Sequence, residues 1–169
     1  PWGHAGRKLA RAPLNPFLPV RSMHDCQRDL AGRLAALESI WAKDSSVRAT
    51  LVGGEKTRLD VHQTWIEERG LVDRSKLTGP FGTDGVVRAM QSHDVLVLNS
   101  RSENFPCVIA EAWACGIPVM STDVGGIREH LPEGPSDRGW RLPAQADVAS
   151  WHAAFNPTHT LSWRPAGMR

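Results

Sequence analysis

The sequence has no tyrosine, only three cysteines and no long apolar run. None of its apolar runs approaches the roughly 20 residues that a membrane-spanning helix needs. Its first ten residues, PWGHAGRKLA, lack the apolar segment of a secretory signal peptide. From these absences we expect neither a membrane span nor a secretory leader.

The cysteines are Cys26, Cys107 and Cys115, an odd number without the spacing of a zinc site. We expect reduced thiols in a cytoplasmic protein, with Cys107 and Cys115 in or near the core. The seven histidines are also scattered without metal-ligand spacing. The sequence therefore predicts no metal site.

An excess of charge of one sign is lacking as well. Twenty Lys and Arg against eighteen Asp and Glu give a net charge of +2, which is too weak to indicate a nucleic-acid partner. Arg7, Lys8 and Arg11 are too few for a phosphate-binding surface, so a solvated basic arm is the simpler interpretation.

What is present is a globular composition, with 41% hydrophobic and 22% charged residues over a length of 169. This length suffices for one domain with a core. We expect an irregular basic arm over 1–16, one folded domain over 17–155 and an irregular tail over 156–169.

Short apolar runs alternate with helix-like stretches about six times. The expected strands are 17–20, 48–52, 76–78, 95–99, 118–121 and 139–142, and the expected helices are 29–43, 58–69, 83–93, 106–115, 126–131 and 147–155. Pro19 weakens the first strand, Thr83 or Asp84 is expected to cap the third helix, and Gly70 is expected to end the second.

This alternation predicts a Rossmann-like α/β fold, an open parallel sheet with helices on both faces. Such sheets bind ligands beyond the carboxyl ends of their strands. The loop Ser102–Pro106 follows the strand at 95–99 and therefore lies where a site is expected.

Two glutamates, Glu103 and Glu111, flank Pro106, which is expected at the first position of a helix. The amides of Phe105, Cys107 and Val108 at this helix start would attract a phosphate. The carboxylates would then accept hydrogen bonds from sugar hydroxyls, as in a nucleoside diphosphate sugar. The alternative is that Glu111 is a solvated helix former and Glu103 only adds charge to the helix start.

The stretch LVLNSRSENFPCVIAEAWACGIPVMSTDVGGIREHL resembles the central signature of retaining glycosyltransferases of the GT-B fold, family 4 (glycosyl transferases group 1). That signature has a strand, a Ser, Glu-Gly-Phe-Pro, Glu-Ala-x-Ala-x-Gly-x-Pro-Val and a Gly-Gly pair. The matching residues here are Ser100, Glu103–Pro106, Glu111–Val119 and Gly125–Gly126. The similarity extends from about Ala49 to Leu142.

The resemblance implies roles for the residues of this motif. Glu103 would be the catalytic residue that holds a hydroxyl of the transferred sugar, and Glu111 would hold the ribose of the donor. The amides around Phe105, Cys107 and Val108 would hold the distal phosphate. Asn104 stands where the family has Gly and tolerates unusual backbone angles. No cofactor is implied.

Two further segments leave alternatives open. Residues 80–85 would form the nucleobase pocket in the family fold, but their Gly and Pro are equally explained by a turn. Asp123 is a turn residue or lines the cleft, and the turn is favoured.

The family's pyrophosphate motif is altered. Arg21 matches an Arg after the first strand, but Cys26 stands where a Lys is expected five residues later. Arg28 could replace that Lys, and both arginines are equally explained as surface cations. Loss of one cation would remove about 2–4 kcal/mol of barrier stabilisation.

The resemblance covers only the donor-binding half of a GT-B enzyme, and the chain begins at Pro1 rather than Met, so a fragment is expected. Its partners would be a nucleoside diphosphate sugar and a missing N-terminal acceptor-binding domain, with peripheral membrane association through that missing half left open. We expect the chain alone not to transfer sugar at an enzymatic rate.

Two other interpretations come from different classes. One is a nucleotide-sugar-binding or regulatory module without transfer activity, which the Cys26 departure and the missing half favour. The other is a phosphorylase or epimerase on the same scaffold. No lysine lies in the central motif to hold pyridoxal, which argues against a phosphorylase.

Overall fold

The computed structural model describes residues 16–20, 30–43, 45–53, 56–104, 106–134 and 136–154. The elements in chain order are β1 (Pro16–Val20), α1 (Leu30–Lys43), β2 (Ala49–Gly53), α2 (Lys56–Glu68), β3 (Ser75–Thr78), α3 (Thr83–Gln91), β4 (Val95–Leu98), α4 (Cys107–Ala114), β5 (Val119–Thr122), the 3-10 helix η2 (Gly125–Glu129), β6 (Gly139–Leu142) and α5 (Val148–Ala154). The predicted arm over 1–16 and the predicted tail lie almost entirely outside the described residues.

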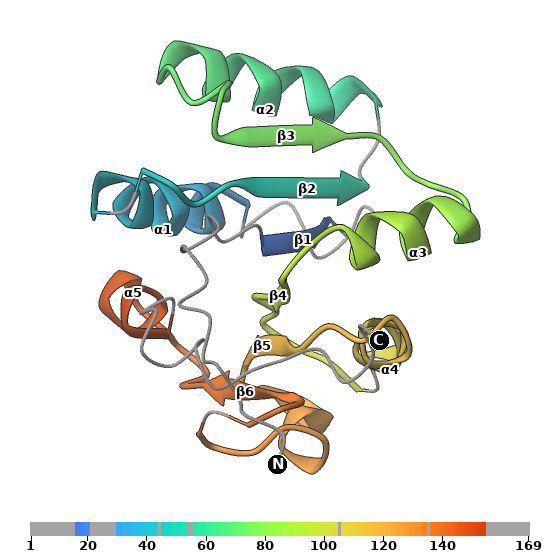
Figure 1. Cartoon of the computed structure of the whole chain (residues 1–169). Helices are drawn as coiled ribbons and strands as arrows, with labels where there is room; N and C mark the ends of the chain where they lie inside the picture. The colour runs from blue at the N-terminus through green and yellow to red at the C-terminus, as the bar shows by residue number, and fades with distance from the viewer. Residues whose placement is uncertain are drawn as a thin grey trace, which may run out of the picture.

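All six strands form one parallel sheet in the order β3-β2-β1-β4-β5-β6 (Figure 1). The chain winds outward from β1 to β3, crosses back to β4 beside β1, and winds outward again to β6. Parallel strands need crossover connections, so a helix lies between each strand and the next one in the chain. The predicted Rossmann-like α/β fold is confirmed.

Two apolar clusters, one on each face, hold the helices against the sheet. Leu37, Ile40 and Trp41 of α1 share a cluster with Ile66 of α2 and Trp151 of α5. The second cluster joins α3 and α4 to the opposite face. Its members include Met90, Val108, Ile109 and Ala112 from these helices and Leu96, Leu98 and Val119 from the strands.

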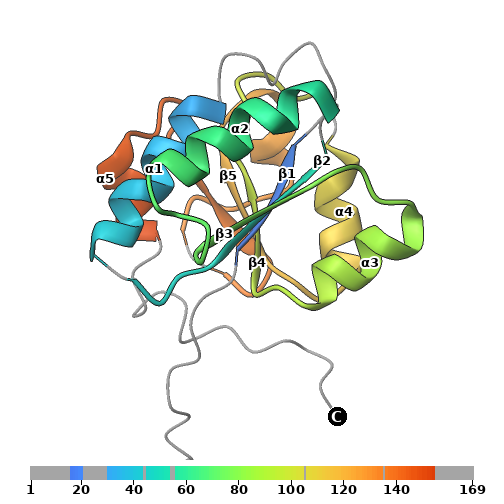
Figure 2. The same ribbon diagram turned by 90° about the horizontal axis from the view of Figure 1, so that it is seen from above.

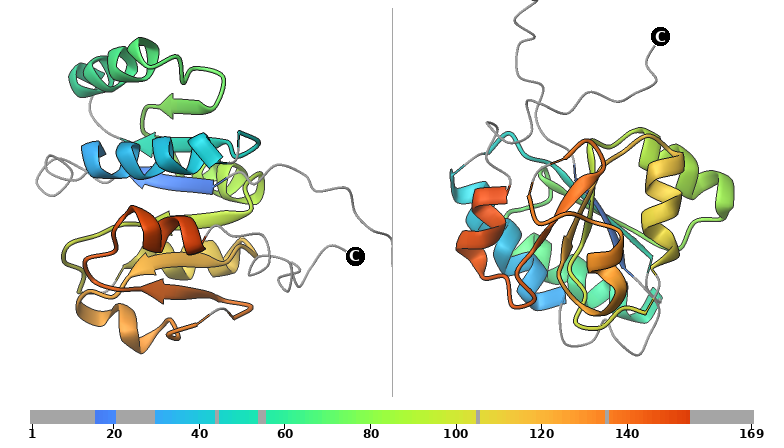
Figure 3. Two further views of the ribbon diagram at one scale, coloured as in Figure 1. Left: turned by 90° about the vertical axis from the view of Figure 1, so that its left-hand side faces the viewer. Right: turned by 90° about the horizontal axis from the view of Figure 1, so that it is seen from below.

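The views along other directions show the same two layers of helices. Figure 2 places α1 and α5 on one side of the sheet and α3 and α4 on the other. Figure 3 shows α1 and α5 side by side on their shared face. Every residue of β4 and β5 is buried, as expected for strands covered on both faces.

β1 lies in the middle of the sheet in spite of Pro19, which sequence reasoning treats as a weakness of this strand. The structure pairs β1 with β2 along residues 17–20 but with β4 only at Pro16 and Phe17. The register with β4 has therefore ended before Pro19, whose missing N–H would cost a ladder hydrogen bond inside a fully paired strand.

Two helix starts differ from the prediction. The N-cap of α3 is Gly82, in extended conformation, so Thr83 and Asp84 are the first helical residues and not caps. Pro106 is the N-cap of α4 rather than its first residue, because its ψ of 91° is extended. The prediction for Gly70 is confirmed by its φ of +63° two residues after Glu68, the last residue of α2.

The reversal of strand order between β1 and β4 fixes where a ligand can bind. The loops after these two strands lead to opposite faces of the sheet, so they diverge and leave a crevice between them. The loop after β1 lies outside the described residues, and the loop after β4 contains Glu103. Within the described ranges, no helix is long and apolar enough to cross a bilayer.

Candidate functional site

Glu103 is buried although it carries a carboxylate and lies in a loop. Its exposed fraction is 8%, and its Oε1 accepts a hydrogen bond of 2.6 Å from the Ser100 hydroxyl. A buried carboxylate needs such partners because desolvation without them is costly. The carboxylate that the sequence places before α4 is therefore a buried, hydrogen-bonded group.

Ser100 is fixed in turn by Thr122 at the end of β5. The Thr122 hydroxyl donates to the Ser100 carbonyl at 2.7 Å and accepts from the Ser100 amide at 3.1 Å. Thr122 is 1% exposed, so its hydroxyl is held by the core strand itself. This pair of hydrogen bonds ties the start of the Glu103 loop to the neighbouring strand.

Gly125 and Gly126 hold the other side of the same loop. The amide of Gly126 donates to the Glu103 carbonyl at 3.0 Å. A Cβ on Gly125, whose φ is +53°, would overlap that carbonyl oxygen, and a Cβ on Gly126 would overlap the Asn104 carbonyl. The Gly-Gly pair of the motif thus lets the turn after β5 press directly against the Glu103 backbone.

The start of α4 is open to a ligand. Its N-cap is Pro106, and no side chain of the described residues caps it. The first amides of a helix lack intrahelical partners and favour an anion. Val108 is buried and anchors this turn, whereas Cys107 is exposed. The expectation that Cys107 lies in or near the core is therefore wrong, because the first helical residue points away from the cluster that holds Val108.

Glu111 is exposed on α4, and Asn104 is exposed in the loop before it. Burial raises the pKa of the half-buried Cys115 thiol, and the charge of Glu111 raises it further. Glu111 and Cys115 are one helical turn apart at the C-terminal end of α4, where the Cys115 amide donates to the Glu111 carbonyl at 3.0 Å. Of the other predicted site residues, Phe105, Arg21 and Arg28 lie outside the described residues.

A hollow of about 560 Å³ lies beyond the end of β3. Its lining residues are Pro80, Phe81, Gly82, Thr83, Asp84, Gly85 and Arg88. Phe81 is 41% exposed, and its side chain lies against Gly85, where a Cβ would come within 3.0 Å of the Phe81 Cβ. Residues 80–82 are therefore a loop that leads into the first turn of α3, and together with 83–85 they line this hollow. Their role as a nucleobase pocket stays a prediction.

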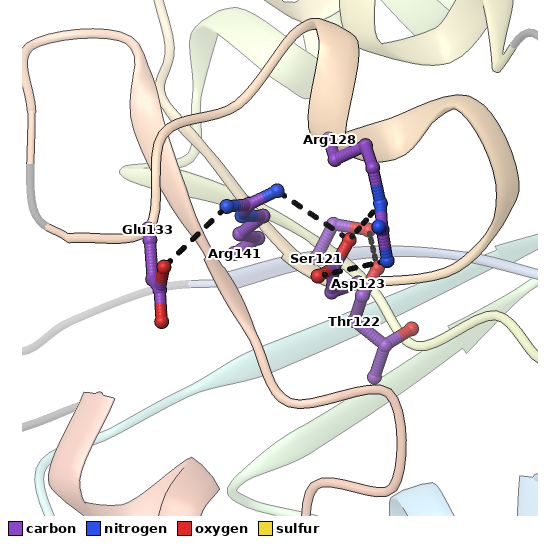
Figure 4. A network of polar contacts seen from close by, with 6 residues as sticks. All are labelled: Ser121, Thr122, Asp123, Arg128, Glu133 and Arg141. Atoms are coloured by element: carbon purple, nitrogen blue, oxygen red, sulfur yellow. Dashed lines mark hydrogen bonds and ion pairs between the residues drawn. The ribbon is translucent and has the colours of Figure 1, made fainter.

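Asp123 is the centre of a charged network rather than a simple turn residue (Figure 4). Its Oδ1 lies 3.4 Å from Arg128 Nε and 3.6 Å from Arg141 Nη1. Arg141 also reaches Glu133 Oε2 at 3.6 Å. Because Arg128 comes from η2 and Arg141 from β6, the network fixes the turn that carries Gly125.

No group of three or more potential metal ligands occurs among the described residues. The arrangement suits instead a negatively charged group at the α4 start with hydroxyl-bearing groups near the two glutamates. The residues that sequence reasoning missed are Ser100, Thr122 and Asp123 as supports. All three lie in the quoted stretch, but only Ser100 matches a residue of the family signature, and Asp123 is predicted as a turn or cleft residue.

Comparison with known proteins places these features in a family. Residues 20–156 match the family model described as Glycosyl transferases group 1. A D-inositol 3-phosphate glycosyltransferase of Mycolicibacterium smegmatis is 31% identical over 131 residues, which cover 75% of this chain and 29% of that protein.

Two solved structures share the fold. Sucrose-phosphate synthase of Thermosynechococcus elongatus has a TM-score of 0.67 at 22% identity, over 89% of this chain and 39% of that one. HepE of Anabaena in complex with UDP also has a TM-score of 0.67, at 24% identity, over 86% of this chain and 39% of that one.

The chain spans about three tenths of the curated relative and about two fifths of each solved chain. The family match begins at the last residue of β1 and continues past α5, so it includes Glu103, Glu111 and the Gly125–Gly126 pair. The chain therefore belongs to the Glycosyl transferases group 1 family.

Proposed function

We propose that this chain is the donor-binding half of a retaining family-4 glycosyltransferase that moves a sugar from a nucleoside diphosphate to an acceptor hydroxyl without a metal. One observation carries the proposal. A buried carboxylate, Glu103, stands directly before the uncapped start of α4, and Glu111 lies on the same helix. The family match supports it.

Each part of the donor has a matching feature. The amides at the start of α4 hold the distal phosphate, because helix starts favour anions. The Glu111 carboxylate accepts hydrogen bonds from the two ribose hydroxyls. The hollow at Phe81 takes the base, and Glu103 accepts a hydrogen bond from the sugar that is transferred.

The reaction breaks the bond between the anomeric carbon and the phosphate oxygen, and the acceptor oxygen forms the new bond on the same face while its proton passes to the leaving phosphate. Negative charge develops on the leaving phosphate, where the α4 amides and Arg21 or Arg28 stabilise it. These donors act as a fixed electrostatic environment, which is why the proposal needs no metal ion.

A second Rossmann-like domain completes this site in the proposal, because the acceptor needs a surface that faces the carboxyl ends of the strands. We place the enzyme in the cytoplasm, with any membrane association made through that second domain. The isolated chain is then expected to bind donor and to show no transfer above background with donor and acceptor. Turnover at an enzymatic rate by the chain alone would contradict the proposal that a second domain is needed for transfer.

Calorimetric titration with UDP, GDP, ADP and dTDP tests the donor site. We expect one nucleotide to bind saturably, with UDP tried first because HepE was solved with it. Glu111→Ala should weaken that binding by about tenfold, as expected when a charged hydrogen-bond acceptor is lost. The control is Glu68→Ala, which removes an exposed glutamate from α2 on the opposite face of the sheet.

Equal loss of affinity in both variants would show that Glu111 has no special role. Absence of binding by a wild-type chain that still melts cooperatively would contradict the donor site in this half alone.

The alternative, a nucleotide-binding module without transfer, is favoured by one observation: Cys26 stands where the family has a Lys. If this change disabled the pyrophosphate site, Cys26→Lys should tighten nucleotide binding by about tenfold or more, in line with a restored charged hydrogen bond. Unchanged affinity would indicate that the site works with Arg21 and Arg28 and would favour the enzyme.

A further inference from the structure

We propose that Ser100 is a positioning residue that aims the Glu103 carboxylate at the donor sugar, and that Thr122 acts on Glu103 through Ser100. This inference rests on the proposed function, since it assigns to Glu103 a hydrogen bond with the transferred sugar. It adds two hydroxyl groups, from two different strands' ends, to the machinery of the site.

The first step of the argument is the hydrogen bond from Ser100 to Glu103. At 2.6 Å between Ser100 Oγ and Glu103 Oε1, it has the length of a charge-assisted O–H···O⁻ bond. Such bonds are about twice as strong as neutral ones. With one carboxylate oxygen fixed in this way, the plane of the carboxylate is fixed as well.

The second step is the rigidity of Ser100 itself. A serine can aim a carboxylate only if its own backbone is held, and loops are mobile without such restraints. Here the Thr122 hydroxyl bonds both the amide and the carbonyl of Ser100, at 3.1 and 2.7 Å. Thr122 is the last residue of a fully buried strand, so the restraint comes from the core.

The third step is that the loop is held on its other side too. Gly126 bonds the Glu103 carbonyl at 3.0 Å, and Gly125 leaves no room for that carbonyl to move toward the turn. The Glu103 backbone is therefore fixed by η2 while its side chain is fixed by Ser100. The first restraint comes from η2, which follows β5, and the second comes through Ser100 from Thr122 at the end of β5.

The role of such aiming is energetic. A carboxylate that is already in place loses no orientational freedom when the sugar binds, and small misplacements of positioned groups are costly. Without the Ser100 hydroxyl, the Glu103 carboxylate loses the hydrogen bond that orients its Oε1, and its bond to the sugar weakens. The nucleotide part of the donor, held by α4 and the hollow, is unaffected.

Because different residues hold the sugar and the nucleotide, the affinity for each can be measured separately. A residue with only a structural role would not change the ratio of the two affinities. The measured quantity is the sugar gain, the ratio of the Kd of a nucleoside diphosphate to the Kd of its sugar conjugate. The probes are UDP, GDP and ADP, with their glucose, N-acetylglucosamine and mannose conjugates, and the conjugate with the largest gain is used. We expect Ser100→Ala to lower the sugar gain by about tenfold, as for a lost hydrogen bond to a charged group.

The matched control is Ser102→Ala in the same loop, since Ser102 is exposed. It should leave both affinities unchanged. Ser100→Thr keeps a hydroxyl and should restore most of the sugar gain. Thr122→Val should lower the sugar gain in the same direction as Ser100→Ala, whereas Thr122→Ser should retain it.

The outcomes separate the two proposals. If the wild type shows a sugar gain and Ser100→Ala retains it in full, the role of Ser100 is overturned. The proposed donor site is not affected by that result. Loss of nucleotide affinity to the same extent as conjugate affinity shows a structural role only and also overturns it. A wild-type chain that binds no nucleotide, or none better as its sugar conjugate, contradicts the assignment of Glu103 in the proposed function and the inference with it.

Discussion

Gly125 and Gly70 both have positive φ angles, but their surroundings differ. A Cβ on Gly125 would overlap the Glu103 carbonyl oxygen, whereas a Cβ on Gly70 would meet nothing within 4 Å. Gly70→Ala should therefore lower the free energy of unfolding by only about 1 kcal/mol, the cost of a left-handed backbone conformation for a residue with a Cβ. At Gly125 we expect a loss of about 3 kcal/mol or more in the free energy of unfolding, because the strained conformation and the overlap add.

Urea unfolding of Gly125→Ala and Gly70→Ala measures the two losses on the same scale. The difference between them isolates the contact with the Glu103 loop from the cost of the φ angle. Equal losses would mean that the turn after β5 can move away from Glu103 without cost.

His93 gives the stability a pH dependence of known sign. Burial lowers the pKa of His93 below 6.5, and Lys76 adds to this, while the Ala89 hydrogen bond and Asp94 oppose it more weakly than burial does. Below pH 6.5 the unfolded chain binds a proton that the native state resists, so the free energy of unfolding falls as the pH drops. The contribution is fully present above pH 6.5.

Urea unfolding at pH 7.5 and 5.5 of the wild type and His93→Gln measures this contribution. We expect the wild type to lose more stability on acidification than the variant. Parallel losses in the two proteins would remove His93 as the cause.

At the residue scale, the sequence singles out Glu103 and Glu111 but does not reveal what surrounds them. The burial of Glu103 depends on Ser100 and Thr122, and the second of these is 19 residues away from Glu103 in the sequence. Spacing in one chain does not reveal which side chains from different strands meet. The roles of both glutamates stay predictions.

Among the elements, the turn between β5 and η2 is held by charge. Asp123 bridges Arg128 of η2 and Arg141 of β6, and the Asp123 and Arg141 side chains are only 24% and 19% exposed. Asp123→Asn would leave two arginines without this carboxylate, so we expect a loss of about 2 kcal/mol in the free energy of unfolding, less than full burial would cause.

Glu133→Gln is the matched control, because Glu133 pairs with the same arginine but is 93% exposed. Exposed ion pairs contribute little, so its effect should stay within about 0.5 kcal/mol. Thermal or urea unfolding compares the two variants. A larger loss from Glu133→Gln than from Asp123→Asn would reverse this assignment.

The elements themselves were predictable because their signals are local. Helical spacing of Leu37, Ile40 and Trp41 and the apolar run at 95–98 required no knowledge of distant residues, and both are buried as expected. Helix caps were less predictable. Thr83 and Pro106 each lie one residue away from the expected position, since several residues near a helix start can serve and local geometry decides.

For the whole molecule, binding of a donor nucleotide should raise stability by mass action. At a free nucleotide concentration of 100 times its Kd, the expected gain is about 2.7 kcal/mol. For a domain of this size that gain corresponds to a rise in Tm of roughly 5–10 °C. Thermal unfolding with and without the nucleotide measures the shift.

The rise should shrink in Glu111→Ala at the same nucleotide concentration, because the variant binds less tightly. A wild-type Tm that does not respond to any nucleoside diphosphate would argue against the donor site independently of calorimetry.

The position of β1 has a consequence for how the molecule forms. Neighbouring strands within β1–β3 and within β4–β6 are joined by short crossovers, whereas β1 and β4 pair Pro16 with Val95, about half the domain away in the chain. Closing that long loop carries the largest entropic cost of any pairing in the sheet, and non-local pairings form slowly. We expect each half of the sheet to collapse first and the seam between them to close last. Since the crevice of the donor site lies at this seam, a refolding chain should regain its helical circular dichroism before it regains the ability to bind nucleotide.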